Sequence, residues 1–301
     1  MKSFVKLIKR NTKMFFKDKG AFFVSMITPI ILLILYITFL GNVYRTTYTS
    51  GIPAGFSLSE DILNGLVGGQ LFSSLLAVSC VTVAFCSNML MVQDKVSGAK
   101  NDLLIAPLKK SKLALSYYIS TLISTLLICV VATVACFVYL AIVGWYLSVL
   151  DIVMIFLDVF LLVMFGTALS SVINHFLTSQ SQISAVGSIV SACYGFICGA
   201  YMPISSFGTG LQKVLSFLPG TYGTSLIRNH AMRGVFDEMV SQGFPTQVVE
   251  SFKDAIDCNI YFFDKQVSIG AMYAVMAASV LVLIAAYVLI NIIHIKKSNK
   301  K

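Results

Sequence analysis

Long apolar runs separated by short polar stretches dominate the pattern along the chain. A helix needs about 20 predominantly apolar residues to cross a hydrocarbon layer about 30 Å thick. The runs Ile30 to Leu35 and Val280 to Ile290 are apolar on every face, whereas a membrane β-barrel needs alternating segments of about 10 residues. The pattern predicts six membrane-spanning helices, over residues 21–41, 62–92, 113–143, 149–173, 181–201 and 267–295.

The composition supports a membrane protein. Of the 301 residues 57% are hydrophobic and 12% are charged, and the mean hydropathy is +0.86. Soluble domains contain roughly 45–50% apolar and about 25% charged residues. A soluble cytoplasmic enzyme and a disordered chain are both excluded, because so much apolar surface cannot remain solvated. We therefore expect an all-α polytopic membrane protein.

The positive charges predict its orientation. Short loops rich in Lys and Arg stay on the cytoplasmic side of a membrane. Most of the 22 basic residues lie before the first span, between the second and third spans, and after the last, so both termini are expected to be cytoplasmic. The net charge of +9 then indicates attraction to anionic lipid, and its division among three segments argues against nucleic acid as a partner. These residues are Lys2, Lys6, Lys9, Arg10, Lys13, Lys17 and Lys19, then Lys95, Lys100, Lys109, Lys110 and Lys112, then Lys296, Lys297, Lys300 and Lys301.

Residues 1–19 are expected to form a helix of a different kind. Phe4, Leu7, Ile8 and Phe15 alternate with cations, so one face can lie in the lipid headgroup region while the Lys side chains reach water. The sequence predicts an interfacial amphipathic helix that bends at Gly20 into the first span. The alternative is a simple positively charged anchor.

Residues 93–112 are the most informative cytoplasmic segment. Asp94 and Lys95 precede Gly98, and the apolar residues Leu103, Leu104 and Ile105 precede a stop at Pro107. This order predicts a short helix that protrudes from the membrane. An exposed apolar patch with a charged rim commonly marks a partner site. The residues of this predicted partner site are Asp94, Lys95, Gly98, Leu103, Leu104 and Pro107.

Residues 202–266, between the fifth and sixth spans, are expected to lie outside. The stretch from Pro203 to Pro219 is apolar but too short to cross a membrane, which predicts a re-entrant helical hairpin from the outer face. The alternative is an amphipathic surface helix. The rest is polar and acidic, with Val248, Phe252 and Ile256 on one helical stripe, which predicts a small external cap.

These two segments resemble those of the ABC-2 type ABC transporter permeases, which have the type V exporter fold. The partner-site residues above carry the first match, and the resemblance implies that they couple the permease to an ATPase. Pro203, Pro219, Tyr222 and Arg228 carry the second match, as a re-entrant gate. The chain departs from the family pattern at Val96, Ala99, Gly208 and Leu218. The resemblance implies a permease in a bacterial plasma membrane that exports a drug, an antimicrobial peptide or a lipid.

The resemblance also implies partners. A dimer of cytosolic ABC ATPase subunits would dock beneath residues 1–19 and the coupling segment, and ATP and Mg would bind there. A second permease copy, identical or paralogous, would face this one through the first and fifth spans. Gly195 and Gly199 have the small-x-x-x-small spacing that lets helices approach closely, so we assign them to that interface. Packing within the chain is the alternative.

The sequence contains no residues expected to hydrolyse ATP or to bind a metal or cofactor. It has no G-x-x-x-x-G-K-[ST] phosphate loop and no H-E-x-x-H pair. His175 and His294 are expected at cytoplasmic helix ends and His230 outside, so the histidines form no cluster. The seven cysteines lack the spacing of a zinc site or a disulfide framework. The chain is therefore not expected to be an enzyme.

The alternative function is a proton-coupled secondary transporter. Asp158 is the one acid deep in a predicted span, and an intramembrane acid is a functional candidate by default. A proton relay also needs further titratable groups at that depth, and the sequence predicts none. A hydrogen bond from a neighbouring Ser, Thr or Tyr is the structural explanation for Asp158. The aromatic residues Phe39, Phe72 and Phe85 suit an amphipathic cargo, although core packing gives the same composition.

Overall fold

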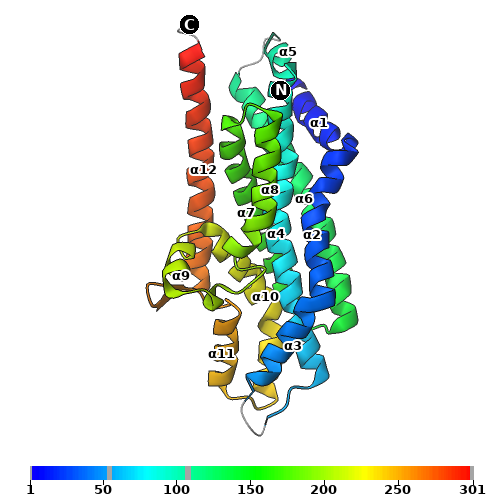
Figure 1. Cartoon of the computed structure of the whole chain (residues 1–301), viewed down its shortest axis with the longest axis vertical. Coiled ribbons are helices and arrows are strands. Elements are labelled where there is room, and N and C mark those ends of the chain that lie inside the picture. Colours follow the sequence, from blue (N-terminus) through cyan, green and yellow to red (C-terminus); the bar gives the residue numbers. More distant parts are fainter. Residues whose placement is uncertain (1, 53–55, 106–109, 299–301) are drawn as a thin grey trace.

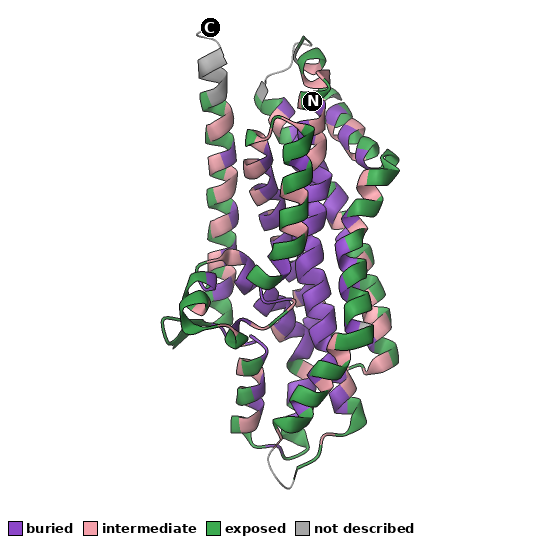
Figure 2. Cartoon of the chain, viewed as in Figure 1, coloured by how far each residue is buried: buried purple, intermediate pink, exposed green. Residues whose placement is uncertain are grey.

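The long helix α4 (Glu60–Val96) forms the centre of the computed structural model, which describes residues 2–52, 56–105 and 110–298 (Figure 1). Figure 2 shows α4 buried along most of its length. A helix without a polar face is buried either among other helices or in lipid, and α4 is buried among other helices. The helices packed on α4 are α2 (Lys19–Leu35), α6 (Lys110–Val143), α7 (Val149–Phe176), α8 (Gln180–Ile197) and α10 (Pro219–Ser241).

The remaining elements lie at the ends and sides of this bundle. Helix α1 packs mainly on α6, and α12 packs on α7 and α10. Helices α1 and α5 and the carboxyl end of α12 lie at one end, and α3 and α11 lie at the other (Figure 1). The bounds are α1 (Lys2–Lys17), a π-helical turn (Tyr36–Leu40), α3 (Gly41–Ser50), α5 (Ala99–Ile105), a 3-10 turn (Ile204–Ser206), α9 (Thr209–Leu215), α11 (Thr246–Ala255), β1 (Tyr261–Phe262), β2 (Lys265–Gln266) and α12 (Ile269–Ser298).

Five helices of the described chain are long and apolar enough to cross a membrane. The sequence predicts six. The difference is α8, an 18-residue helix that begins with the polar residues Gln180, Ser181 and Gln182 and is not among these candidates. The five candidates are Lys19–Ser50, Glu60–Val96, Ser111–Val143, Val149–Phe176 and Ile269–Ile293.

The first span differs from its predicted bounds at both ends. The break between α1 and α2 lies at Asp18 and not at Gly20, because the Asp18 carboxylate accepts a hydrogen bond from the Ala21 amide at 3.0 Å and caps α2. The helix also continues beyond residue 41 to Ser50. Threonine hydroxyls in this extension bond to carbonyls four residues earlier, so polar residues continue the helix.

The sequence predicts a polar loop for residues 219–241. In the structure these residues form the helix α10, much of which is buried against α4, α7 and α12. Glycines allow this burial, since a Cβ on Gly234 would lie 1.8 Å from the backbone oxygen of Tyr146, and one on Gly223 would lie 2.6 Å from Leu162. Helix α10 lacks a clear apolar stripe, because many of the residues with which it contacts neighbouring helices are small or are polar with hydrogen-bond partners.

Candidate functional site

Asp94, in the last turn of α4, joins three helices at the end of the bundle that carries α1. Its carboxylate accepts hydrogen bonds from both Arg10 guanidinium nitrogens of α1, at 2.6 and 3.2 Å, and from the Tyr117 hydroxyl of α6 at 2.6 Å. The buried Asp94 raises the pKa of Arg10 above its ordinary value by accepting these hydrogen bonds. A two-pronged Arg–carboxylate pair fixes direction as well as distance. We name Arg10, Asp94 and Tyr117 the inner junction.

Lys95 also points into the chain rather than towards a partner. Its ammonium group donates to the carbonyls of Asn174, His175 and Leu177 at 3.4, 2.5 and 3.2 Å. These carbonyls are at the carboxyl end of α7, where a helix dipole attracts a cation. Lys95 therefore ties the end of α4 to the end of α7.

Gly98 allows the turn between α4 and α5. Its φ is +83°, which a side chain disfavours, and the Ser97 amide bonds to the Gln93 carbonyl at 2.9 Å to close the last turn of α4. The chain then starts α5 at Ala99. The predicted glycine thus sets the angle of α5.

The sequence predicts that the apolar residues of α5 face outwards, but not all of them do. Leu103 is half-buried against a cluster that includes Leu7, Met91 and Leu113. Ile105 has 84% of its surface exposed. The side chain of Leu104 and the whole of Pro107 lie outside the described residues. Ile105 is thus an exposed apolar residue of α5 that the predicted coupling set omits.

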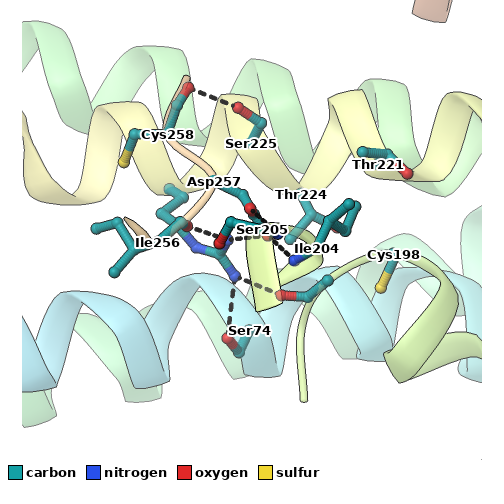
Figure 3. Close-up of polar contacts among 12 residues, drawn as sticks. Ser74, Cys198, Ile204, Ser205, Thr221, Thr224, Ser225, Ile256, Asp257 and Cys258 are labelled. Atoms are coloured by element: carbon teal, nitrogen blue, oxygen red, sulfur yellow. Dashed lines mark hydrogen bonds and ion pairs between the residues drawn. The ribbon is translucent and has the colours of Figure 1, made fainter. Parts of the chain in front are cut away.

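Arg228 organises the opposite half of the molecule. It lies on α10 and is fully buried, and it donates to the Gly199 carbonyl at 2.9 Å and to the Ile256 carbonyl. Ser73 and Ser74 of α4 accept weaker bonds at 3.4 and 3.5 Å. Arg228 therefore connects α4, α10, the turn after α8 and the turn after α11, as the contacts in Figure 3 illustrate.

Asp257 is the counter-charge of Arg228, and sequence reasoning missed it. Its carboxylate lies 3.7 Å from the guanidinium and accepts hydrogen bonds from the Ile204 and Ser205 amides at 2.5 and 3.1 Å (Figure 3). Burial raises the pKa of Asp257, and Arg228 and the two amides oppose that rise. No local pattern marks Asp257, because its partners come from segments far away in the sequence. We name Arg228 and Asp257 the outer ion pair.

The other predicted gate residues lie at the turns on either side of α9. Pro203 precedes the 3-10 turn, and Pro219 occupies the first turn of α10, where its missing amide proton is not needed. The buried Tyr222 hydroxyl donates to the Ser216 carbonyl at 2.5 Å. The structure thus places Pro203 next to the outer ion pair, since the Ile204 amide bonds to Asp257. It places Pro219 and Tyr222 at the start of α10, the helix that carries Arg228.

Gly195 and Gly199 both have contacts within the chain. A Cβ on Gly195 would lie 2.4 Å from the ring of Tyr201, so the glycine lets that ring fold back onto α8. Gly199 has a φ of +73° and its carbonyl binds Arg228. These contacts support the intrachain alternative. A role at an interface between two copies stays a prediction.

Asp158 has two partners in the interior. The Tyr273 hydroxyl of α12 donates to one carboxylate oxygen, and His230 Nδ1 of α10 lies 2.6 Å from the other. The hydroxyl partner agrees with the structural explanation, but the expectation that no further titratable group lies at the depth of Asp158 is wrong, because His230 lies beside it. His230 is buried because α10 is buried.

Two cavities adjoin these sites. One, of about 690 Å³, is lined by residues of the π-helical turn, α3, the α8 end and α11, including Phe39, Tyr48 and Phe252. The other, of about 570 Å³, is an almost wholly apolar groove among α4, α7, α8 and α12, and Phe85 lines it. Phe72 is a core residue.

Within the part of the chain that the structure describes, no group of three or more His, Cys, Asp or Glu could hold a metal ion.

A family model described as ABC-2 type transporter matches residues 2–231, which include the inner junction, α5 and Arg228. The chain belongs to the ABC-2 type transporter family. It is a multi-pass membrane permease without ATPase activity, of a kind that generally pairs with an ABC ATPase subunit and normally binds no cofactor. No curated protein sequence matches the permease significantly.

Proposed function

We propose that this permease is the membrane subunit of an ATP-driven exporter that moves an amphipathic cargo out of the cytoplasm or the inner leaflet. The cargo class is a drug, an antimicrobial peptide or a lipid. The observation that carries the proposal is α5, a short helix with Ile105 exposed, joined through Gly98 to the central helix. An ATPase bound to α5 would act directly on α4.

The topology that goes with this function has six spans, with α8 as the fifth. Both termini and α5 are cytoplasmic in a bacterial plasma membrane, α1 lies on the inner surface, and the segment from 202 to 266 is external, with a re-entrant turn between Pro203 and Pro219. Most basic residues of α1, α4 and α5 lie at the end of the bundle that this topology makes cytoplasmic (Figure 1), as short inner loops require.

Coupling then divides between two groups of residues. Asp94, Lys95 and Gly98 position α5, because the inner junction and the Lys95 bonds hold the end of α4 against α1, α6 and α7. Leu103, Leu104, Ile105 and Pro107 belong to the docking segment. Movement of a docked pair of ATPase subunits would reach the spans as rigid-body motion, since packed helices shift as units.

The second permease copy would pack on the face formed by α2 and α8. Ile27 and Ile31 of α2 and Phe196 of α8 are all exposed, as an unpaired membrane surface or an interface would be. Gly195 and Gly199 would shape the end of α8 at this face. The cavity of about 690 Å³ beside that end is the candidate exit site for cargo, and the gate residue Pro203 lines it.

A second candidate, proton-coupled transport through Asp158, is favoured by one observation. His230 supplies a second titratable group at 2.6 Å, which a proton relay requires. Membership of the ABC-2 family argues for ATP as the energy source, so this candidate ranks second.

The test of the proposal replaces Ile105 with Asp. A carboxylate buried unpaired in a docking interface costs several kcal/mol, which weakens binding by roughly a hundredfold or more. We expect Ile105→Asp, and equally Leu104→Asp, to lose the copurifying ATPase and export. Asn101→Asp is the matched control, because it adds the same charge to an exposed position of α5.

The measurements are the amount of permease in the membrane, the ATPase that copurifies with it, and the export rate. If Ile105→Asp reaches the membrane in normal amounts, retains its ATPase and exports at the original rate, α5 is not the coupling site.

A further inference from the structure

Three exposed aromatic rings from two distant segments meet on a projection beside α12. Phe217 follows α9, and Phe262 and Phe263 belong to the β1–β2 hairpin. Their ring centroids lie 4.9 to 5.8 Å apart. Phe217 is 61% exposed, Phe263 52% and Phe262 36%. We name these three rings the aromatic tip; Figure 1 shows α9, next to which they lie, projecting from the side of the bundle.

The turn of the β1–β2 hairpin contains an aromatic residue at a position that usually holds Asn, Asp or Gly. Tyr261 pairs with Gln266 and Phe262 with Lys265, so Phe263 and Asp264 form a two-residue turn, with φ of 47° and 65°. Such turns favour Asn, Asp and Gly, because a left-handed backbone costs an ordinary L-residue roughly 1–2 kcal/mol. A bulky aromatic residue at the first turn position is therefore unusual.

Burial within the chain does not offset that cost. About half of Phe263 is exposed, and its ring neighbours are the other two rings of the tip and the Lys213 ammonium, which lies 5.8 Å from the ring centroid. Leu211 and Val214 of α9 are also exposed, at 47% and 59%, and extend the apolar surface. A contact outside this chain accounts for an aromatic residue at the turn better than its own packing does.

The start of α12 sets the depth of the tip. Strand β2 ends at Gln266, and the membrane-spanning part of α12 begins at Ile269. The hairpin therefore lies within a few residues of the point where the chain enters the hydrocarbon layer. Aromatic rings concentrate at that boundary, and Lys side chains there extend to lipid phosphates. Lys213 and the exposed Lys265 are placed to do so.

We propose that the aromatic tip inserts into the headgroup boundary of the leaflet on the side away from α1, with Lys213 and Lys265 facing the phospholipid phosphates. The partner is the lipid surface itself. This contact fixes the depth at which α12 starts and anchors α9, which leads into α10. It depends on α12 being a membrane helix and is independent of cargo, of the ATPase and of the direction of transport.

The test uses fluorescence from single tryptophans. The one natural tryptophan, Trp145, is replaced by Phe, and Phe263→Trp supplies the reporter. Phe56→Trp is the matched control, because Phe56 is 39% exposed and its ring lies 5.1 Å from Phe244, away from the aromatic tip. Both proteins are placed in liposomes of phosphatidylcholine and phosphatidylglycerol, with and without bromine on the acyl chains.

We expect the tryptophan at 263 to emit at shorter wavelength, to lose intensity in brominated lipid and to be protected from aqueous iodide. The control at 56 should show the reverse. If iodide quenches both equally and bromine quenches neither, the tip lies in water and the proposal is wrong. If the tryptophan at 263 is shielded from both quenchers, protein covers the tip, for instance a second copy, and the lipid assignment is also wrong.

A second variant separates lipid contact from folding. Phe263→Asn removes the ring but suits the left-handed turn, so the hairpin should be retained. With Phe262→Trp as reporter, we expect Phe263→Asn to reduce quenching by brominated lipid and to increase quenching by iodide. Unchanged quenching would show that Phe263 does not hold the tip in the membrane.

Discussion

Asp94 illustrates what the sequence can and cannot reveal about a single residue. Its place before a short apolar helix predicts the coupling segment, but the spacing cannot say which way a charged side chain points. The carboxylate points inwards because Arg10 and Tyr117 are within hydrogen-bonding distance. Those partners lie on α1 and α6, and only the packed bundle brings them together. Ile105 is exposed and Leu103 is half-buried, and nothing in the sequence around these two apolar residues distinguishes them.

The outer ion pair provides a residue-scale prediction. Asp257→Asn leaves the buried guanidinium of Arg228 without a counter-charge, and breaking a buried pair in this way costs roughly 3–5 kcal/mol. We expect the free energy of unfolding in detergent to fall by about that amount. Asp237→Asn, at an exposed acid of α10, is the control and should be nearly neutral.

The double variant Arg228→Met with Asp257→Asn should regain part of the loss, because no unpaired charge then remains inside. A double variant less stable than Asp257→Asn alone would contradict the pairing and point to the carbonyl bonds of Arg228 as the main contribution.

At the scale of elements, the apolar helices were predictable and the polar ones were not. Helices α4, α6, α7 and α12 follow from long runs of apolar residues, which in a membrane permit little besides a spanning helix. Helix α10 lacks that signal, since Arg228 and His230 are buried with polar partners. The extension of the first helix to Ser50 also lacks an apolar signal, because it contains threonines whose hydroxyls bond to backbone carbonyls four residues earlier.

Gly234 provides a test of the close packing between α10 and the α6–α7 connection. A Cβ there would collide with the backbone of Tyr146, which cannot rotate away as a side chain can. We expect Gly234→Ala to lower the thermal unfolding temperature, despite the higher helix propensity of Ala. Gly210→Ala on α9 is the control, because open space surrounds it and the substitution should stabilise by about 0.5–1 kcal/mol. Equal stabilisation by both variants would place α10 farther from the α6–α7 connection.

At the scale of the whole molecule, the assembly of two copies can be tested through a native cysteine. Cys193 on α8 is free and exposed, while the other six cysteines are buried or partly buried. If two copies pack through α2 and α8, mild oxidation in membranes should yield a disulfide-linked dimer on a non-reducing gel. Cys193→Ser should abolish it. A permease that remains monomeric under oxidation, although Cys193 reacts with a maleimide, would argue against two copies meeting at that position.

The energy source is the remaining question about the whole molecule, and Asp158→Asn distinguishes the two candidates. Asparagine keeps a carbonyl oxygen to accept the Tyr273 bond and gains an amide that can donate to His230 Nδ1, but it cannot take up a proton. The link among α7, α10 and α12 therefore persists while proton transfer at this site is lost. In liposomes that contain the permease and its ATPase, we expect ATP-dependent transport by Asp158→Asn to continue at a rate close to that of the wild type.

The same liposomes with a protonophore should also continue to transport, and those with a hydrolysis-deficient ATPase should not. Transport that survives the loss of ATP, stops when the proton gradient is collapsed and is abolished in Asp158→Asn would reverse the assignment. Asp158, His230 and Tyr273 would then form the proton site, and α5 would lose its role as the point of energy input. Because the two mechanisms predict opposite outcomes for both the variant and the protonophore, they can be separated without knowing the natural cargo, using any amphipathic dye that the permease accepts.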